Sequence, residues 1–168
     1  KQIPLYTYLI KMTIKLIAVG KTDQKELQHL IDVYISRLKH YVSFEINIIP
    51  DIRHSKNLSE SQQKSKEAAL ILKQITPADI FILLDENGKS YDSVAFSNYL
   101  QKQMLSGQKQ LVFVIGGPYG FSEEVYQRAH GKISLSKMTF SHQMIRLFMV
   151  EQLYRGFSIL KNEPYHHR

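Results

Sequence analysis

The chain has 168 residues, of which 43% are hydrophobic, and it contains no cysteine. That length corresponds to one domain, and that composition to a folded core rather than a disordered tail. The absence of cysteine excludes a disulfide framework, thiolate metal sites and cysteine nucleophiles. The formal net charge of +7 suggests a polyanionic partner, although charge alone does not identify one.

Residues 1–11 are expected to be an extension that is not native to the protein. Their apolar run, Ile3 to Ile10, is too short to span a bilayer, and no small-residue cleavage site follows it. Met12 is followed at once by a good strand, which favours Met12 as the native start and 12–168 as a single domain. With no membrane segment and no cysteine, the chain is expected to be cytoplasmic.

The first half of the chain predicts two strands and two helices. The strands are β-rich apolar runs, expected over Ile14–Val19 and Phe44–Ile49. The helices have apolar residues at helical spacing, over about 24–40 and from Ser59 to about Ile75. Two pairs have the spacing of a capping box, Asp23 with Glu26 and Ser59 with Gln62. Residues 51–58 are polar without a period and predict a loop.

The second half continues the alternation of strands and helices. Strands are expected over Ile80–Leu84, Leu111–Ile115 and Ile133–Leu135. Helices are expected over about 92–105, from Ser122 onward, and over about 142–161. Residues 85–89 predict a turn, and residues 116–120 a glycine-rich loop. Repeated strand–helix alternation is typical of an α/β fold with a mainly parallel sheet.

Three loops follow predicted strands in this half: Leu84–Lys89, Gly116–Gly120 and Leu135–Ser141. Ligands of open parallel sheets bind beyond the carboxyl ends of the strands, so these loops are the candidate binding loops. The glycine loop suits a close ligand approach, but an ordinary tight turn explains it equally. It matches neither G-x-G-x-x-G nor a P-loop, which argues against nicotinamide dehydrogenases and nucleotide hydrolases.

The loop Leu135–Phe140 mixes small hydroxyl side chains with apolar ones. Backbone amides and carbonyls exposed in such a loop could form hydrogen bonds with a flat, neutral ring such as adenine. The alternative is a plain connector that ends in an N-capping Ser141.

The last predicted helix carries two pairs of polar residues spaced four apart. His142 and Arg146 lie on one face, where they could bind a phosphate or a base edge or form a solvated surface. Glu151 and Arg155 are interpreted as a surface ion pair. A wide apolar stripe on this helix predicts core packing, with self-association as a further use; it comprises Ile145, Phe148, Met149, Leu153, Phe157 and Leu160.

The chain ends in Tyr165, His166, His167 and Arg168. Such a tail suits RNA through stacking and phosphate contact, although a terminal His-His is also typical of a floppy end or a tag remnant. No grouping of His, Asp and Glu has convincing metal spacing, and no G-x-S-x-G motif occurs.

Several long motifs, taken together, resemble the ribosomal large-subunit methyltransferase H family, a branch of the SPOUT superfamily. The resemblance covers 12–168, in order and at the expected spacing. It rests on MTIKLIAVGK (12–21), LLDENGK (83–89), FVIGGPYG (113–120), ISLSKMTFSHQMIR (133–146), VEQLYRGFSI (150–159) and PYHH (164–167).

The resemblance implies a SPOUT-type α/β knot, with helices on both faces of the sheet and a C-terminal trefoil knot, a topology otherwise nearly absent from proteins. It implies a homodimer that binds S-adenosylmethionine and methylates N3 of a pseudouridine in helix 69 of 23S ribosomal RNA, on the assembled ribosome. No metal is implied. The implied cofactor contacts are Leu84, Gly116, Leu135, Ser136, Lys137, Met138, Thr139 and Phe140. Ser141 departs from the family, in which proline is expected.

Four residues are the candidates for catalysis, by positioning RNA or by removing a proton: His142, Arg146, Tyr165 and His166. Histidine titrates near neutral pH and so suits removal of the N3 proton, whereas the arginine and the tyrosine suit phosphate or a base oxygen. The tail of one subunit is expected to complete the site of the other. The alternatives are a non-catalytic ribosome- or RNA-binding protein with the same fold and, less favoured, a Rossmann-type oxidoreductase.

Overall fold

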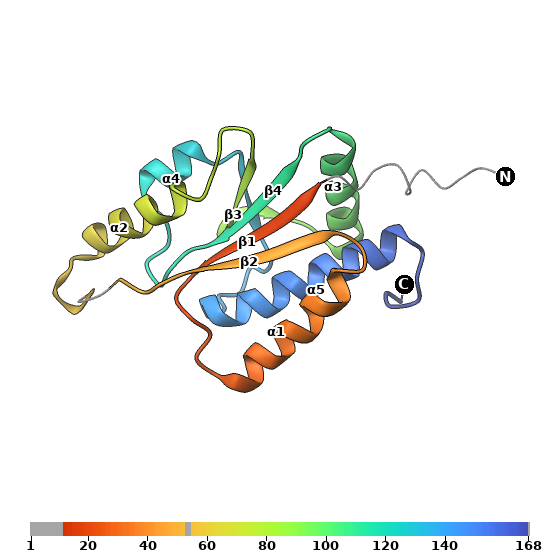
Figure 1. The fold of residues 1–168 in the computed structure, drawn as a ribbon, viewed down its shortest axis with the longest axis horizontal. Helices are drawn as coiled ribbons and strands as arrows, with labels where there is room; N and C mark the ends of the chain where they lie inside the picture. Colours follow the sequence, from red (N-terminus) through yellow and green to blue (C-terminus); the bar gives the residue numbers. More distant parts are fainter. Residues whose placement is uncertain (1–11, 53–54, 168) are drawn as a thin grey trace.

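The computed structural model describes residues 12–52 and 55–167 (Figure 1). The predicted extension, residues 1–11, lies outside the described residues. Strands and helices alternate as predicted. In chain order the elements are β1 (Thr13–Val19), α1 (Lys25–Leu38), β2 (Ser43–Ile49), the 3₁₀ turn η2 (Ser55–Asn57), α2 (Glu60–Leu72), β3 (Ile80–Ser90), α3 (Ser93–Leu105), β4 (Gln110–Ile115), α4 (Glu123–Arg128), β5 (Gly131–Ser134) and α5 (His142–Leu160).

The strands form one sheet in the order β2-β1-β4-β3-β5, and every neighbouring pair is parallel. This confirms the predicted α/β class. Because the strands are parallel, the carboxyl ends of β3, β4 and β5 lie at one edge of the sheet. Threading of the C-terminal segment into a knot stays a prediction.

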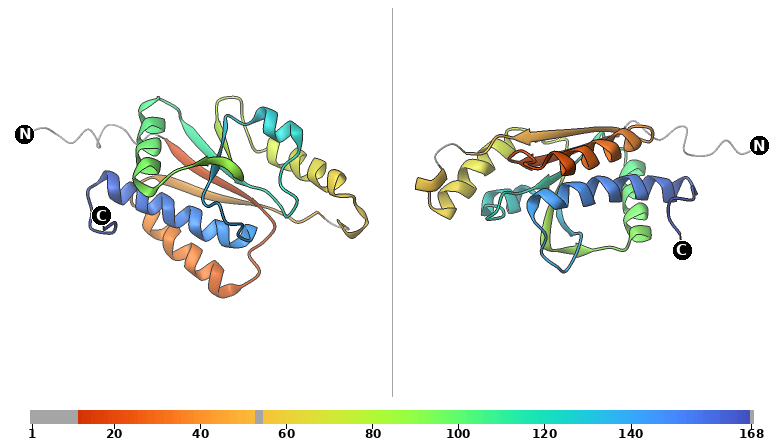
Figure 2. Two further views of the ribbon diagram at one scale, coloured as in Figure 1. Left: turned by 180° about the vertical axis from the view of Figure 1, so that it is seen from behind. Right: turned by 90° about the horizontal axis from the view of Figure 1, so that it is seen from below.

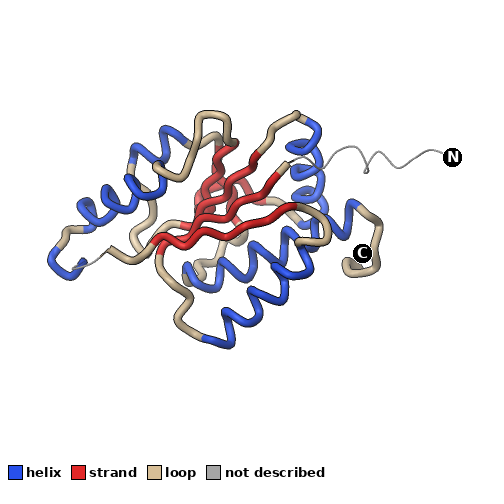
Figure 3. The backbone as a smooth tube through the Cα atoms, viewed as in Figure 1, coloured by secondary structure: helices blue, strands red, loops and turns tan. Residues whose placement is uncertain are grey.

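Helices cover both faces of the sheet (Figures 1 and 2). α1, α3 and α5 pack on one face around Ile14, Leu16 and Ala18 of β1. α2 and α4 pack on the other face around Ile17 and Val19 of the same strand. Figure 3 shows the strands side by side with the helices flanking them. Burial on both faces explains why the strands are continuous apolar runs.

The predicted turn at 85–89 is wrong, because β3 continues to Ser90. Ile133 of β5 pairs first with Leu84 and then again with Lys89, so residues 85–88 bulge out of the ladder between these two partners. Gly88 brings the strand back to β5: a Cβ there would lie 2.6 Å from the backbone of Ile133. We call residues 85–88 the β3 bulge.

One predicted capping box forms and the other does not. Ser59 Oγ accepts from the Gln62 amide at 3.2 Å, and Gln62 Oε1 accepts from the Ser59 amide at 2.9 Å. The box at Asp23 is wrong, since α1 begins after Gln24 with no side-chain cap. Asp23 bonds to α5 instead: its amide donates to Gln143 Oε1, and its carboxylate accepts from Gln143 Nε2.

Other element bounds differ from the predictions by a few residues. α2 ends at Leu72 and passes into a 3₁₀-type turn, in which the Ile75 amide donates to the Leu72 carbonyl at 3.2 Å. The predicted loop at 51–58 contains the short η2 turn. No helix within 12–52 and 55–167 is long and apolar enough to cross a membrane.

Candidate active site

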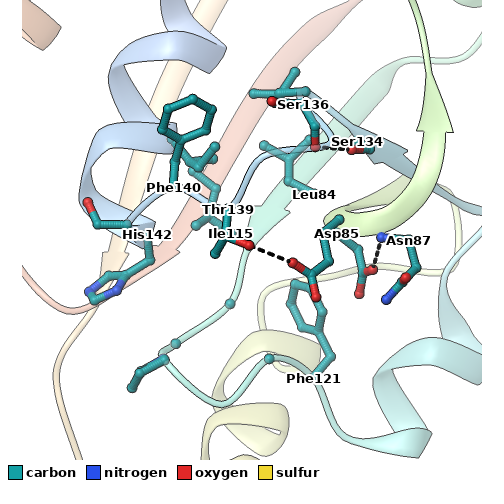
Figure 4. A pocket seen from close by; sticks show the side chains of 18 of the residues that line it. Leu84, Asp85, Asn87, Ile115, Phe121, Ser134, Ser136, Thr139, Phe140 and His142 are labelled. Carbon is teal, nitrogen blue, oxygen red and sulfur yellow. Dashed lines mark hydrogen bonds between the residues drawn. The ribbon is translucent and has the colours of Figure 1, made fainter.

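A cavity of about 590 Å³ lies at the carboxyl edge of β3, β4 and β5 (Figure 4). The three loops chosen from the strand ends meet there, and this volume is ordinary for a small-molecule site. Of the cofactor contacts that the resemblance implied, the lining includes Leu84, Gly116, Leu135, Ser136, Met138, Thr139 and Phe140, and it also includes the catalytic candidate His142. Lys137 is not among the lining residues; it is exposed.

The glycine loop after β4 forms one wall of the cavity. Gly120 has a φ of +75°, and its amide donates to the Gly117 carbonyl at 3.1 Å, so the segment is a tight turn. A Cβ at Gly117 would lie 2.6 Å from Oε2 of Glu67, a buried side chain of α2. A Cβ at Gly116 would lie 3.1 Å from the ring of Phe121. Both interpretations of the glycine loop therefore hold: it forms a tight turn, and its backbone lines the cavity.

The β3 bulge carries carboxylates to the same cavity. Asp85 Oδ1 accepts from the Asn87 amide at 2.8 Å, and Asp85 Oδ2 accepts from the Tyr126 hydroxyl at 2.5 Å. Burial, and then the hydrogen bond to Asp85, raises the pKa of Tyr126, so its hydroxyl stays a donor. No local sequence pattern pointed to Tyr126, because its partner lies 41 residues away.

The loop 135–141 uses its hydroxyl groups to hold its own shape. Ser134 Oγ donates to the Ser136 carbonyl at 2.7 Å, and Ser136 Oγ accepts from the Met138 amide at 2.9 Å. Thr139 Oγ1 donates to Glu86 Oε2 at 3.2 Å, which joins this loop to the β3 bulge. The ring of Phe140 packs edge-on against Phe148 of α5, with centroids 5.0 Å apart.

His142 and Arg146 lie four apart on α5, but the structure gives them different surroundings. His142 lines the cavity, whereas Arg146 is fully buried. The Arg146 guanidinium donates to the Val19 carbonyl at 2.7 Å and to Thr22 Oγ1 at 3.1 Å. Burial lowers its pKa, while Asp51 and Asp23 act in the opposite direction. Arg146 thus faces β1 and does not form the outward-facing basic pair that its spacing suggested.

Tyr165 and His166 lie beside the other end of α5. Tyr165 Oη donates to Glu151 Oε1 at 3.0 Å, and it lies 3.2 Å from Tyr34 Oη of α1. The Arg155 guanidinium stands 4.6 Å from the centroid of the Tyr165 ring and 3.4 Å from His166 Nδ1. Glu151 and Arg155 form the predicted ion pair, but they are partly buried beneath this tail rather than set on an open surface.

The tail is held at a distance from the cavity of its own chain. Tyr41, in the turn between α1 and β2, donates to Glu163, and the rings of Tyr154 and Tyr165 have centroids 4.6 Å apart. At a rise of about 1.5 Å per residue, Arg155 lies roughly 20 Å along α5 from His142. Neither Tyr165 nor His166 lines the cavity.

Within the described part of the chain, no group of three or more His, Cys, Asp and Glu side chains is placed to hold a metal ion. The polar groups around the cavity are hydroxyls, backbone amides, the side-chain amide of Asn87, carboxylates and one imidazole. These groups suit a polar organic ligand.

A family model described as a predicted SPOUT methyltransferase matches residues 12–166. The chain belongs to the SPOUT methyltransferases. Within that family it is 66% identical to the ribosomal RNA large subunit methyltransferase H of Christiangramia forsetii and 69% identical to that of Flavobacterium psychrophilum. Each match covers 94% of this chain and 100% of the relative. The resemblance seen in the motifs is thereby confirmed.

A more distant relative supports the family at lower identity. The ribosomal RNA large subunit methyltransferase H of Parabacteroides distasonis is 60% identical over 93% of this chain and 99% of its own length. A crystal structure described as a probable methyltransferase from Bordetella pertussis has a TM-score of 0.51 at 9% identity, over 88% of this chain and 97% of that one. At such identity the likeness concerns the fold alone.

Proposed function

We propose that this SPOUT methyltransferase moves a methyl group from S-adenosylmethionine to N3 of a pseudouridine in helix 69 of 23S ribosomal RNA, on the assembled ribosome. The observation that carries the proposal is the meeting of Leu84, Gly116 and the loop 135–140 around one cavity of about 590 Å³. Its highly identical relatives bear the name of a large-subunit ribosomal RNA methyltransferase. Because its substrate would be the ribosome, we propose that the protein acts in the cytoplasm.

The residues present fit S-adenosylmethionine. Gly116 and Gly117 let the ligand approach backbone, and Leu84, Leu135 and Phe140 supply apolar walls for a flat ring. Asp85 and Glu86 bring negative charge to the lining, which suits a cationic sulfonium. When bound, the cofactor supplies an electrophilic methyl group on sulfur.

The chain's own part in the reaction is to position the acceptor and to remove a proton. In-line attack needs the reacting atoms held about 3–3.5 Å apart. The N3–H of pseudouridine is a weak acid, so a base within hydrogen-bond reach helps it leave. His142 lines the cavity and His166 lies on the tail, and we propose that one of them accepts that proton.

The position of the tail supports a homodimer with shared sites. Tyr165 and His166 are fastened beside α1 and the far end of α5, away from the cavity of their own chain. If these residues act on the RNA base, they must reach a cavity on another chain. We propose a two-fold dimer in which the tail of each subunit completes the site of the other. Arg146, being buried, serves this reaction by holding α5 against β1.

The decisive experiment is transfer of a labelled methyl group to ribosomes from a strain that lacks the native enzyme. The expected result is one labelled nucleotide in helix 69, identified as N3-methylated pseudouridine. Label at another position would overturn the assigned substrate. Failure to bind S-adenosylmethionine in calorimetry would favour the alternative, a non-catalytic ribosome- or RNA-binding protein.

Two further measurements test the histidines and the shared site. His142→Ala and His166→Ala enzymes are compared in single-turnover reactions, and full rates for both would exclude a histidine base. His166→Ala is then mixed, after unfolding and refolding together, with an inactive cavity variant such as Gly117→Val. Shared sites predict partial recovery of activity in the mixture, whereas sites built within one chain predict none.

A further inference from the structure

The charge of the cavity differs in sign from the charge of the chain. The chain carries a formal charge of +7. Among the described residues that line the cavity, the acidic ones are Asp85 and Glu86, and no lysine or arginine occurs. The lining is therefore locally acidic in a basic protein, and such a cavity favours a cationic ligand over a neutral one.

The fold places these carboxylates through a nonlocal contact. Ile133 pairs with both Leu84 and Lys89, which forces the residues between them out of the ladder and toward the cavity. Gly88 permits this geometry, because a side chain there would strike the backbone of Ile133. Figure 4 shows Asp85 and Asn87 beside the cavity, between Leu84 and Phe121.

The two carboxylates are held differently. Asp85 accepts from the Asn87 amide and from the Tyr126 hydroxyl, so both of its oxygens are engaged within the protein. Glu86 is exposed, and its Oε2 accepts from the Thr139 hydroxyl at 3.2 Å. Glu86 is therefore the carboxylate that the protein engages less, and Thr139 keeps it against the loop that lines the cavity.

We propose that Glu86 is a specificity-determining residue: held by Thr139 at the cavity, it makes the site prefer the cationic sulfonium donor to the neutral thioether product. This inference rests on the proposed function. S-adenosylmethionine carries one more positive charge than S-adenosylhomocysteine, while the two share the adenosine and amino acid parts. A nearby carboxylate therefore distinguishes them by charge, and the product leaves more readily once the methyl group has been transferred.

Calorimetry with both nucleosides tests the role of Glu86 without measuring activity. The measured quantity is the ratio of the dissociation constant of S-adenosylhomocysteine to that of S-adenosylmethionine. For Glu86→Gln we expect this ratio to fall by about 3- to 10-fold relative to wild type, as for the loss of one partly screened charge. Glu124→Gln is the matched control, since Glu124 is exposed on α4 and outside the cavity lining, and it should leave the ratio unchanged.

Two further variants separate the charge from the hydrogen bond. Glu86→Asp keeps the charge, so its ratio of dissociation constants should stay close to that of the wild type. Thr139→Val removes the hydrogen bond that holds Glu86 and keeps both carboxylates, so the ratio should fall, but by less than in Glu86→Gln. Added salt should lower the ratio in the wild type more than in Glu86→Gln.

The outcomes distinguish this inference from the proposed function. If the wild-type chain binds both nucleosides and Glu86→Gln keeps the wild-type ratio, Glu86 does not set specificity and only this inference falls. If the wild-type chain binds neither nucleoside, the proposed function falls and takes this inference with it. An equal fall of the ratio in Glu124→Gln would assign the effect to overall charge and would also overturn the role of Glu86.

Discussion

The guanidinium of Arg146 donates a hydrogen bond to the backbone carbonyl of Val19 across 2.7 Å, which joins α5 to the carboxyl end of β1. A second bond, to Thr22 Oγ1, and the paired bonds between Asp23 and Gln143 reinforce the junction. The first turn of α5 directly follows the loop 135–141 of the cavity. By holding α5 against β1, Arg146 fixes the carboxyl end of the loop 135–141.

Replacing Arg146 should lower the free energy of unfolding, because Arg146 is a buried structural residue rather than an RNA contact. Arg146→Met leaves the Val19 carbonyl buried without its donor, and we expect a loss of about 3 kcal/mol in the free energy of unfolding. Urea unfolding measures it. Arg146→Lys, which keeps a positively charged donor group, should lose less. Unchanged stability together with weakened ribosome binding would restore the anion-binding role suggested by the spacing from His142.

The β3 bulge depends on the absence of a side chain at Gly88. Gly88→Ala would place a Cβ 2.6 Å from the Ile133 backbone, and we expect it to lose about 3 kcal/mol of stability because the strands must separate. Gly131→Ala is the matched control on the neighbouring strand. Its Cβ would meet Ile82 Cδ1 at 3.6 Å, an ordinary contact, so its stability should change by about 0.5 kcal/mol or less. Equal losses in the two variants would contradict this account of the bulge.

Ser141 replaces an expected proline and caps α5 with its side chain. Ser141 Oγ accepts from the Met144 amide at 3.2 Å, so Ser141→Ala should cost about 1 kcal/mol in thermal or urea unfolding. Ser141→Pro should lose less, because the φ of −61° at this position already suits proline. Gln24→Ala, at a helix start with no side-chain cap, is the control expected to change little. A Ser141→Ala protein as stable as wild type would show that the cap contributes nothing.

The sequence predicted the fold class and the three binding loops because both depend on local pattern. Runs such as Leu111–Ile115 are apolar throughout, and the structure buries that strand on both faces of the sheet. Helical spacing and the Ser59–Gln62 pair located helices within a few residues. The rule that ligands bind at the carboxyl ends of parallel strands then selected the loops that meet at the cavity.

The remaining features depend on contacts between residues far apart in the chain. The segment DENGK has the composition of a turn, but Lys89 pairs again with Ile133, so residues 85–88 form a bulge within β3. The main-chain partner of Arg146 lies 127 residues away, so its spacing from His142 suggested a surface pair where the fold makes a buried junction. Tyr165 likewise bonds to Tyr34 across 131 residues. No local period encodes such partners.

Alkaline pH should destabilise the protein through its partly buried tyrosines. Burial, and then the hydrogen bond to Asp85, raises the pKa of Tyr126 above its ordinary value of 10.0, and the pKa values of Tyr41, Tyr99 and Tyr165 are raised as well. Above pH ~10 the unfolded chain loses these phenolic protons while the folded chain still holds them. The stabilisation is therefore complete below that pH and is lost as the pH rises toward the folded-state values.

Urea unfolding at a series of pH values and absorbance titration of the phenolate test this account together. The free energy of unfolding should fall above pH ~10, and part of the phenolate signal should appear only as the protein unfolds. Tyr126→Phe should be less stable at neutral pH, having lost its hydrogen bond to Asp85, yet its stability should fall less steeply with pH. A Tyr126→Phe protein with the wild-type pH slope would mean that Tyr126 ionises equally in the folded and unfolded chains, and its bond to Asp85 would then contribute nothing to alkaline stability.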